Sequence, residues 1–214
     1  MKSHRSTALV ATLAALLTLA GCSEGGAAQP TRSTTGDCPT SEPAALAAGE
    51  QREIVMNTSM GEITLFLEAD LSPIAVGNFV ALAECGFYDN VIFHRIAYMQ
   101  DGTPFVIQGG DPTGTGMGDP GYKIKDEPVI GEYRRGVLAM ARSAAPNSQG
   151  SQFFIVLDDG AAGPLESART YAILGEVTAG MDVVDTIAAV ERDQEDRPVV
   201  PVTILSTTVS TPAP

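Results

Sequence analysis

The sequence predicts a mostly β domain in which short antiparallel strands form a closed or sandwiched sheet, and three observations support this prediction. Short apolar runs recur from residue 54 onward, clusters of Gly, Pro and Asp separate them, and only two stretches have the pattern of a helix. Many short strands bounded by turn residues are typical of antiparallel barrels and sandwiches. The 214 residues are 44% apolar and 18% charged, which fits one globular domain with tails.

The first residues are expected to form an export signal. Lys2 and Arg5 give a positive start, residues 7–20 form an apolar stretch too short to span a bilayer comfortably, and Leu19-Ala20-Gly21-Cys22 ends it. This ending resembles the lipobox of bacterial lipoproteins, which implies removal of residues 1–21 and attachment of acyl chains, such as palmitate, to Cys22. An ordinary signal peptide in which Cys22 is incidental is the alternative.

Residues 22–52 are expected to be the lipidated Cys22 and a flexible linker. The stretch 23–49 consists largely of Gly, Ala, Ser, Thr and Pro, and it cannot bury enough apolar surface to become ordered. Several acyl chains hold a protein to a membrane stably, whereas one does not. We therefore expect an extracytoplasmic protein, lipid-anchored to the bacterial cell membrane.

Charge and cysteine content narrow the partners and the compartment. The 26 acidic and 13 basic side chains give a net charge of −13, so nucleic acid is not an expected partner. If Cys22 is acylated, Cys38 and Cys85 remain, an even number in an oxidising compartment. A disulfide between them is the hypothesis, and two free thiols are the alternative.

The ordered domain is expected over residues 53–209 and should begin with a hairpin. Residues 54–56 and the alternating residues 62–67 predict two strands joined by a turn at 57–61. A helix should follow, with Ser72 as its side-chain cap, Pro73 in its first turn and Gly86 as its left-handed end.

The rest of the domain should be mostly extended. Strands are predicted at residues 91–93, 105–107, 137–140, 153–157, 171–174 and 202–205, and a second short helix at 181–188. Residues 206–214 should fray from a strand end into a tail, of which 210–214 lie outside the domain.

The residue content argues against several kinds of chemistry, because the residues that they need are missing. His4 would leave with the signal, so His94 would be the one remaining histidine; we expect it to be a hydrogen-bonded structural residue, and we expect no metal and no cofactor. The glycine-rich run 109–118 lacks the Lys-Ser/Thr ending of a phosphate loop, so it predicts a tight loop. Two acidic pairs are expected in solvated turns: Asp126-Glu127 and Asp158-Asp159.

Three blocks carry a resemblance to a known family. In chain order they read GFYDNVIFHRI (86–96), FVIQGGD (105–111) and LAMARSAAPNSQGSQFFI (138–155). They resemble the corresponding blocks of cyclophilins, and the resemblance covers residues 53–209. It implies a closed eight-stranded antiparallel β-barrel capped by two α-helices, with the active groove on the outer face.

The resemblance implies a peptidyl-prolyl cis/trans isomerase, which accelerates rotation about Xaa-Pro bonds. Rotation needs no nucleophile, because the barrier of about 18–20 kcal/mol comes from amide resonance. By resemblance, Arg95 would donate a hydrogen bond to the prolyl nitrogen and so stabilise the twisted amide. Gln108 and Gln152 would orient Arg95 and the substrate carbonyl.

The resemblance also implies the substrate-binding residues. Phe105, Val106, Phe154 and Leu165 would form an apolar floor for the proline ring, and Tyr171 stands where relatives carry His or Tyr. The backbone of Ala141 and Arg142 would pair with an extended substrate. Taken singly, each floor residue has the ordinary alternative of a core position.

Two departures from the family pattern are visible. Phe105 follows Arg95 by ten residues, about five more than the family commonly has, so residues 97–104 imply an inserted loop with a turn at Asp101-Gly102. The chain has no Trp, and Pro164 stands beside Leu165 where cyclosporin-sensitive members carry one, so weak cyclosporin binding is expected.

The sequence thus predicts a monomeric, membrane-anchored isomerase that assists the folding of exported proteins. Its partners would be Pro-containing unfolded or exported polypeptides. The alternative is a non-catalytic module that binds Pro motifs at the membrane, because the inserted loop could displace the floor from Arg95.

Overall fold

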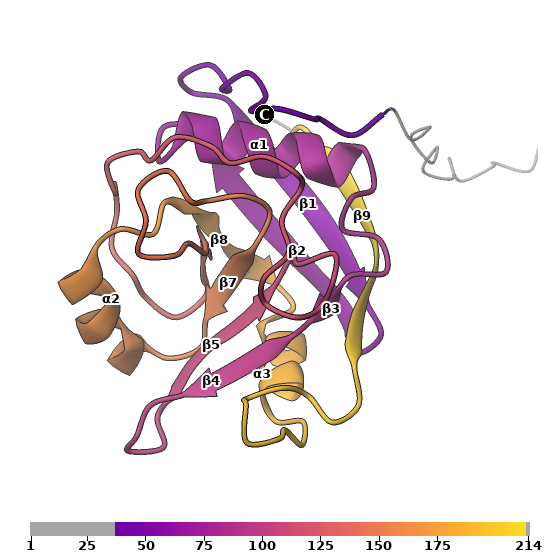
Figure 1. Cartoon of the computed structure of the whole chain (residues 1–214), viewed down its shortest axis with the longest axis vertical. Helices are drawn as coiled ribbons and strands as arrows, with labels where there is room; N and C mark the ends of the chain where they lie inside the picture. Colours follow the sequence, from indigo (N-terminus) through magenta and orange to yellow (C-terminus); the bar gives the residue numbers. More distant parts are fainter. Residues whose placement is uncertain (1–36, 213–214) are drawn as a thin grey trace, which may run out of the picture. The chain divides into compact units, whose positions relative to one another are not determined.

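Nine antiparallel strands form a nearly closed barrel in the computed structural model, which describes residues 37–212 (Figure 1). Neighbouring strands follow the order β3-β9-β1-β2-β8-β6-β7-β5-β4. The barrel implied by the resemblance is therefore confirmed, with nine strands in the described residues instead of eight. Their bounds are β1 Gln51–Thr58, β2 Gly61–Glu68, β3 Ile92–Phe93, β4 Arg95–Tyr98, β5 Pro104–Gly109, β6 Val137–Met140, β7 Phe153–Val156, β8 Ile173–Ala179 and β9 Val202–Ser210.

The barrel closes at His94. The two outermost strands of the sheet are β3, which pairs with β9, and β4, which pairs with β5, and only His94 separates them in the chain. The His94 N–H donates to the Gln108 carbonyl at 3.0 Å. The two edges of the sheet are thus consecutive parts of one segment, and Arg95 begins the strand that leaves this junction.

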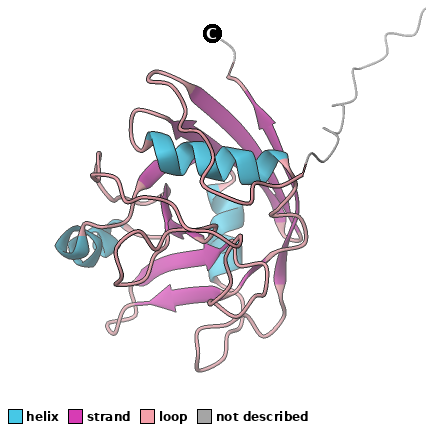
Figure 2. Cartoon of the chain, turned by 45° about the horizontal axis from the view of Figure 1, so that its top comes forward, coloured by secondary structure: helices cyan, strands magenta, loops and turns pink. Residues whose placement is uncertain are grey.

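Helices lie at both ends of the barrel and on its outside (Figures 1 and 2). α1 (Pro73–Glu84) and α3 (Met181–Ala188) were both predicted, α3 with the same bounds. A third helix, α2 (Ala162–Ala168), follows the 3-10 turn η1 (Asp159–Ala161) and was missed. With seven residues and one buried side chain, Leu165, α2 has too little apolar periodicity to be recognised.

Alternation along the strands separates the barrel interior from the outer face. Ile96, Ile107, Phe153 and Ile155 are fully buried in the interior core with side chains of β1, β2, α1 and α3. Successive side chains of a strand point to opposite faces. The residues between these core positions therefore face outward, and they include five of the predicted site residues: Arg95, Val106, Gln108, Gln152 and Phe154.

The start of α1 is capped by a distant carboxylate. Ser72 was expected to cap it, but the Ser72 hydroxyl donates to the Leu71 carbonyl and makes no cap hydrogen bond. The Glu127 carboxylate accepts instead from the N–H groups of Ile74 and Ala75, at 2.9 and 2.8 Å. The expectation of a solvated turn is therefore wrong for Glu127, because a helix start that lacks a local cap draws in an acceptor from elsewhere.

The end of α1 is as predicted. Gly86 has a φ of 76°, and the N–H groups of Gly86 and Phe87 donate to the carbonyls of Ala83 and Leu82. This pair of hydrogen bonds is the Schellman arrangement, which needs a left-handed residue at the position of Gly86.

Residues 37–50, which the sequence assigned to the linker, lie against α1. A disulfide joins Cys38 to Cys85, with Cα atoms 5.2 Å apart, and the Leu46 N–H donates to the Pro73 carbonyl. At Gly77 the segment approaches so closely that a Cβ atom would lie 2.6 Å from the Ala44 carbonyl oxygen. No helix within residues 37–212 has the length and hydropathy to cross a membrane. The expected signal and Cys22 lie outside the described residues.

Candidate active site

Three side chains form a polar chain on the outer face; they come from β4, from β5 and from the residue directly before β7. Arg95 on β4 lies opposite Gln108 on β5, and its Nη1 donates to Gln108 Oε1 at 3.4 Å. Gln108 Nε2 donates to Gln152 Oε1 at 2.9 Å, and Gln152 Nε2 donates to the carbonyls of Gly116 and Gly118. The chain Arg95–Gln108–Gln152 therefore ends on the backbone of the glycine-rich loop.

The inserted residues are absorbed at the tip of the β4–β5 hairpin. Arg95, Ile96 and Ala97 pair in unbroken register with Gln108, Ile107 and Val106, and the bulge lies beyond them, between Ala97 and Tyr98. The strand extends to Tyr98, so the loop is shorter than the expected 97–104. Val106 thus lies opposite Ala97, the second residue after Arg95, and the extra residues do not separate Val106 from Arg95.

The four predicted floor residues and Tyr171 lie together in a second apolar cluster on the outer face. Val106, Phe154 and Leu165 are only 3%, 4% and 3% exposed, and Phe105 and Tyr171 pack against them. The rings of Phe154 and Tyr171 meet edge to face with centroids 5.3 Å apart. The cluster places apolar side chains on the face that carries Arg95, because Val106 lies opposite Ala97, and α2 supplies its Leu165.

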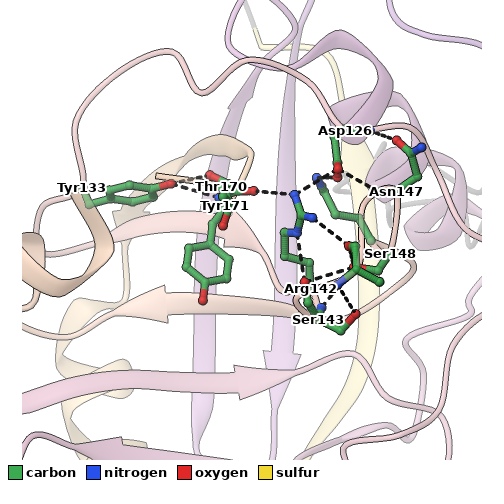
Figure 3. A network of polar contacts seen from close by, with 10 residues as sticks. Asp126, Tyr133, Arg142, Ser143, Asn147, Ser148, Thr170 and Tyr171 are labelled. Atoms are coloured by element: carbon green, nitrogen blue, oxygen red, sulfur yellow. Dashed lines mark hydrogen bonds and ion pairs between the residues drawn. The ribbon is translucent and has the colours of Figure 1, made fainter. Parts of the chain in front are cut away.

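Tyr133, which no sequence pattern indicates as a site residue, fixes one wall of this cluster (Figure 3). Its hydroxyl donates to the Tyr171 carbonyl at 2.7 Å and accepts from the Tyr171 N–H at 3.2 Å. The side chain is 2% exposed, and burial raises the pKa of its hydroxyl to about 12. A lone Tyr in a polar stretch carries no local signal of such a role, because the role depends on a partner 38 residues away.

All three guanidinium nitrogens of Arg142 contact other groups of the same chain (Figure 3). It is 10% exposed, its Nη1 lies 3.0 Å from Asp126 Oδ2, and Nε and Nη2 donate to the carbonyls of Ser143 and Ala145. Asp126 also accepts from the Asn147 N–H at 2.8 Å. Asp126 was expected in a solvated turn, and this is wrong because the carboxylate neutralises a nearly buried guanidinium. What Arg142 can offer a ligand is therefore its backbone.

The second acidic pair also has structural partners. Asp158 accepts from the Gly160 N–H as the cap of η1, and Asp159 accepts from the Arg135 N–H. The expectation of a solvated turn is therefore incomplete for this pair, because both carboxylates also accept hydrogen bonds from backbone N–H groups in turns.

A pocket of about 310 Å³ lies beside the polar chain. Gln108, Ala141, Arg142 and Gln152 contribute to its wall, and the remaining lining comes from the glycine-rich loop and the segments that follow it: Gly116, Met117, Gly118, Asp119, Lys123, Ser143, Ser148, Gly150 and Ser151. Four of the predicted site residues thus line one cavity next to the apolar cluster.

A buried carboxylate holds the glycine-rich loop. Asp111 is fully buried and accepts from the N–H groups of Thr113, Gly116 and Gly118 at 2.7, 2.6 and 3.0 Å. Burial alone would raise the pKa of Asp111, but these hydrogen bonds outweigh it and lower the pKa to about 2. The loop is therefore tightly turned, as predicted, and it presents two fixed carbonyls to Gln152.

Residues of and after α1 fix the other side of Gln152. Asn78 Nδ2 donates to the Gly150 carbonyl at 2.7 Å, and the Tyr88 hydroxyl donates to the Ser151 carbonyl at 3.1 Å. Ser151 Oγ donates to the carbonyl of Gly110, whose φ is 86° and where a Cβ would collide with Ser151. The carbonyls of Gly150 and Ser151 and the Ser151 hydroxyl are thus all hydrogen-bonded, and these bonds hold the backbone directly before Gln152.

His94 differs from its expected role as a hydrogen-bonded residue. It is buried, and within residues 37–212 neither ring nitrogen has a hydrogen-bond partner. Burial lowers its pKa, although the nearby Asp111 raises it in part. Among the described residues, no group of three or more His, Cys, Asp or Glu side chains is arranged to hold a metal ion.

The arrangement suits a ligand with an apolar ring and a weak acceptor. A ring seated on the apolar cluster would bring its acceptor atom toward the Arg95 guanidinium, a planar group with several N–H donors. An extended backbone would find Ala141 and Gln152 at the adjacent pocket.

Known isomerases resemble the chain over most of its length. Residues 53–209 match the family model described as cyclophilin type peptidyl-prolyl cis-trans isomerase/CLD. A peptidyl-prolyl cis-trans isomerase of Arabidopsis thaliana is 41% identical over 167 residues, which are 75% of this chain and 95% of that protein. The probable peptidyl-prolyl cis-trans isomerase A of Mycobacterium leprae is 40% identical over 174 residues, which cover 72% of this chain and 90% of the other.

Solved structures agree with these sequence matches. The crystal structure of a cyclophilin type peptidyl-prolyl cis-trans isomerase of Cryptosporidium parvum superposes with a TM-score of 0.67 at 32% identity, and covers 76% of this chain and 99% of that one. A second structure of that protein, in the presence of the dipeptide Ala-Pro, has a TM-score of 0.66 at 32% identity and covers 75% and 99% of the two chains.

Proposed function

This chain belongs to the cyclophilin-type peptidyl-prolyl cis-trans isomerases, and we propose that Arg95 is the group that accelerates rotation about Xaa-Pro bonds in its substrates. The observation that carries the proposal is the register of β4 and β5, which sets Arg95 opposite Gln108 and keeps Val106 of the floor close by on the same face.

The chemistry required of Arg95 is modest. As the amide twists, resonance is lost and the prolyl nitrogen regains a lone pair that can accept a hydrogen bond. A charge-assisted hydrogen bond contributes about 1.5–3 kcal/mol, which corresponds to about one to two powers of ten in rate. The remaining acceleration would come from holding the substrate in a near-twisted geometry.

The apolar cluster and the adjacent pocket would provide that hold. The proline ring would rest on Val106 and Phe154, and the backbone of Ala141 would pair with the substrate chain. The relative from Cryptosporidium parvum was crystallised in the presence of Ala-Pro, a dipeptide with an Xaa-Pro bond, which supports this substrate class.

The test is a protease-free peptide exchange assay on the full chain. Arg95→Ala should lower kcat/KM by at least about tenfold, whereas Arg134→Ala, which removes an exposed arginine paired with Glu176, should not. Wild-type activity of Arg95→Ala would remove the proposal. Binding of Pro peptides without any acceleration would favour the non-catalytic module.

The amino-terminal sequence supports a proposal for the cellular role. We propose that Cys22 carries the lipid anchor and that the isomerase assists folding of exported proteins outside the cell membrane, as a monomer. The lipobox-like Leu19-Ala20-Gly21-Cys22 supports the anchor, and the Cys38–Cys85 disulfide suits an oxidising compartment. Mass spectrometry of the protein from a bacterial membrane fraction should find acylated Cys22, and Cys22→Ala should release the protein; an unmodified mature chain would contradict this.

A further inference from the structure

A second side chain contacts Arg95 besides Gln108. Arg95 Nε lies 3.8 Å from Oδ2 of Asp196, a residue 101 positions later in the chain. Nη1 donates to Gln108 Oε1, so two of the three guanidinium nitrogens have protein partners. Within residues 37–212, Nη2 has none, which makes it the nitrogen left for a substrate.

The backbone holds Asp196 at this place. The loop 191–199 lies along the outer edge of β4, because the Ile96 N–H donates to the Asp196 carbonyl at 2.8 Å. The loop is itself closed by the Val199 N–H, which donates to the Glu191 carbonyl, and by Asp193, whose Oδ1 accepts from the N–H groups of Glu195 and Arg197. Asp196 is therefore fixed next to the strand that carries Arg95.

A second arginine fixes the direction of the carboxylate. Arg192 Nη1 donates to the Ile96 carbonyl at 2.9 Å, and its guanidinium stacks over the Tyr98 ring at 3.9 Å. The same Nη1 lies 3.8 Å from Asp196 Oδ1. Asp196 thus bridges a firmly held arginine on one oxygen and Arg95 on the other.

We propose that Asp196 is a positioning residue for the isomerase reaction: it holds the Nε side of Arg95 while Gln108 holds Nη1, so that Nη2 is the donor to the prolyl nitrogen. The inference rests on the proposed function of Arg95. A guanidinium held at two corners keeps its plane and direction, whereas one held at a single corner by a 3.4 Å contact can swing.

Asp196→Asn is the informative variant. Asp196 has a φ of 64°, a left-handed conformation that Asn adopts readily, so the substitution removes the charge and leaves the loop intact. Glu195→Gln removes an equal charge from the neighbouring exposed residue and is the matched control. Thermal melting of both variants should equal that of the wild type.

The expected result is a fall in kcat of about two- to fivefold for Asp196→Asn, as the modest strength of a partly exposed ion pair implies, with KM unchanged. The Nε–H resonance of Arg95 in a nitrogen-15 spectrum should also shift. Glu195→Gln should change neither. An unchanged or raised kcat, or a change confined to KM, would overturn the inference.

The failure of this inference is distinguishable from failure of the proposed function. If Arg95→Ala loses activity while Asp196→Asn keeps it, Arg95 is the donor and Asp196 has no part in positioning it. If Arg95→Ala itself keeps wild-type activity, the proposed function falls and the inference falls with it.

Discussion

Arg95 and Gln108 lie opposite each other on adjacent antiparallel strands, with Arg95 Nη1 3.4 Å from Gln108 Oε1. Arg95 directly follows the junction where the barrel closes, and Gln108 lies on the paired strand. Backbone hydrogen bonds therefore fix both Cα positions. The position of the guanidinium is thereby tied to the rigid part of the molecule, and its direction is left to side-chain contacts.

Removing Gln152 should leave the direction of the Arg95 guanidinium less well fixed, although Gln152 acts on Arg95 only through Gln108. In Gln152→Ala, Gln108 loses its Nε2 acceptor and can turn away from Arg95, so we expect kcat/KM to fall about fivefold, the equivalent of one ordinary hydrogen bond. Gln100→Ala, at an exposed position in the β4–β5 hairpin, is the control and should match the wild type. Equal activity of the two variants would show that the polar chain has no role in the reaction.

Tyr133→Phe should loosen the wall that carries Tyr171. The change removes the one hydroxyl that pairs with both the N–H and the carbonyl of Tyr171, so the free energy of unfolding should fall by about 1–3 kcal/mol. Urea unfolding measures this change. We also expect a raised KM for Pro peptides, because Tyr171 packs on Phe154 of the floor; unchanged stability and KM would contradict the assigned role.

The disulfide should stabilise the fold without affecting the chemistry. The bridge closes a loop of 47 residues, for which the chain-entropy estimate is about 4 kcal/mol. Reduction, or the Cys38→Ser/Cys85→Ser double variant, should lower the free energy of unfolding by about this amount. The urea midpoint should fall accordingly, while kcat/KM at 25 °C stays the same. An unchanged midpoint would mean that the disulfide adds nothing to stability.

Acid should destabilise the protein through Asp111. The pKa of this carboxyl is about 2 in the folded protein against an ordinary value of 3.8, so the folded state favours the ionised form. The stabilisation is therefore complete above about pH 4 and is lost as the pH falls through 2, and the shift corresponds to about 2 kcal/mol. Chemical unfolding at pH 4 and at pH 2 should show the loss, and Asp111→Asn should be less stable at pH 4 and should lack this part of the pH dependence.

Local patterns predicted most of the secondary structure. Alternating apolar residues predicted β2, short apolar runs predicted β1, β5, β6, β7 and β9, and Pro73 and Gly86 bounded α1. β4 was missed because Arg95 and its neighbours read as part of a signature block followed by an insertion, and α2 because it buries a single side chain. In both cases tertiary contacts supply what the local pattern lacks.

The resemblance named residues that the fold brings together, but it could not name the residues that support them. Glu127 at the start of α1, Tyr133 behind Tyr171 and Asp196 beside Arg95 each act on a partner far away in the chain. Such pairs leave no periodic or spacing signal in one sequence, since only the folded chain sets their distance. Cyclosporin binding, which the missing Trp predicts to be weak, stays a prediction.

The most direct test of the account compares Arg95→Ala and Arg95→Lys with the wild-type chain in the protease-free exchange assay. Lysine keeps the charge but loses the planar fork that Gln108 and Asp196 hold, so both variants should lose at least about tenfold in kcat/KM. Binding of a Pro peptide, followed by its chemical shifts, should change by less than about twofold if the lost interaction belongs to the transition state. Wild-type exchange rates in Arg95→Ala would contradict the account.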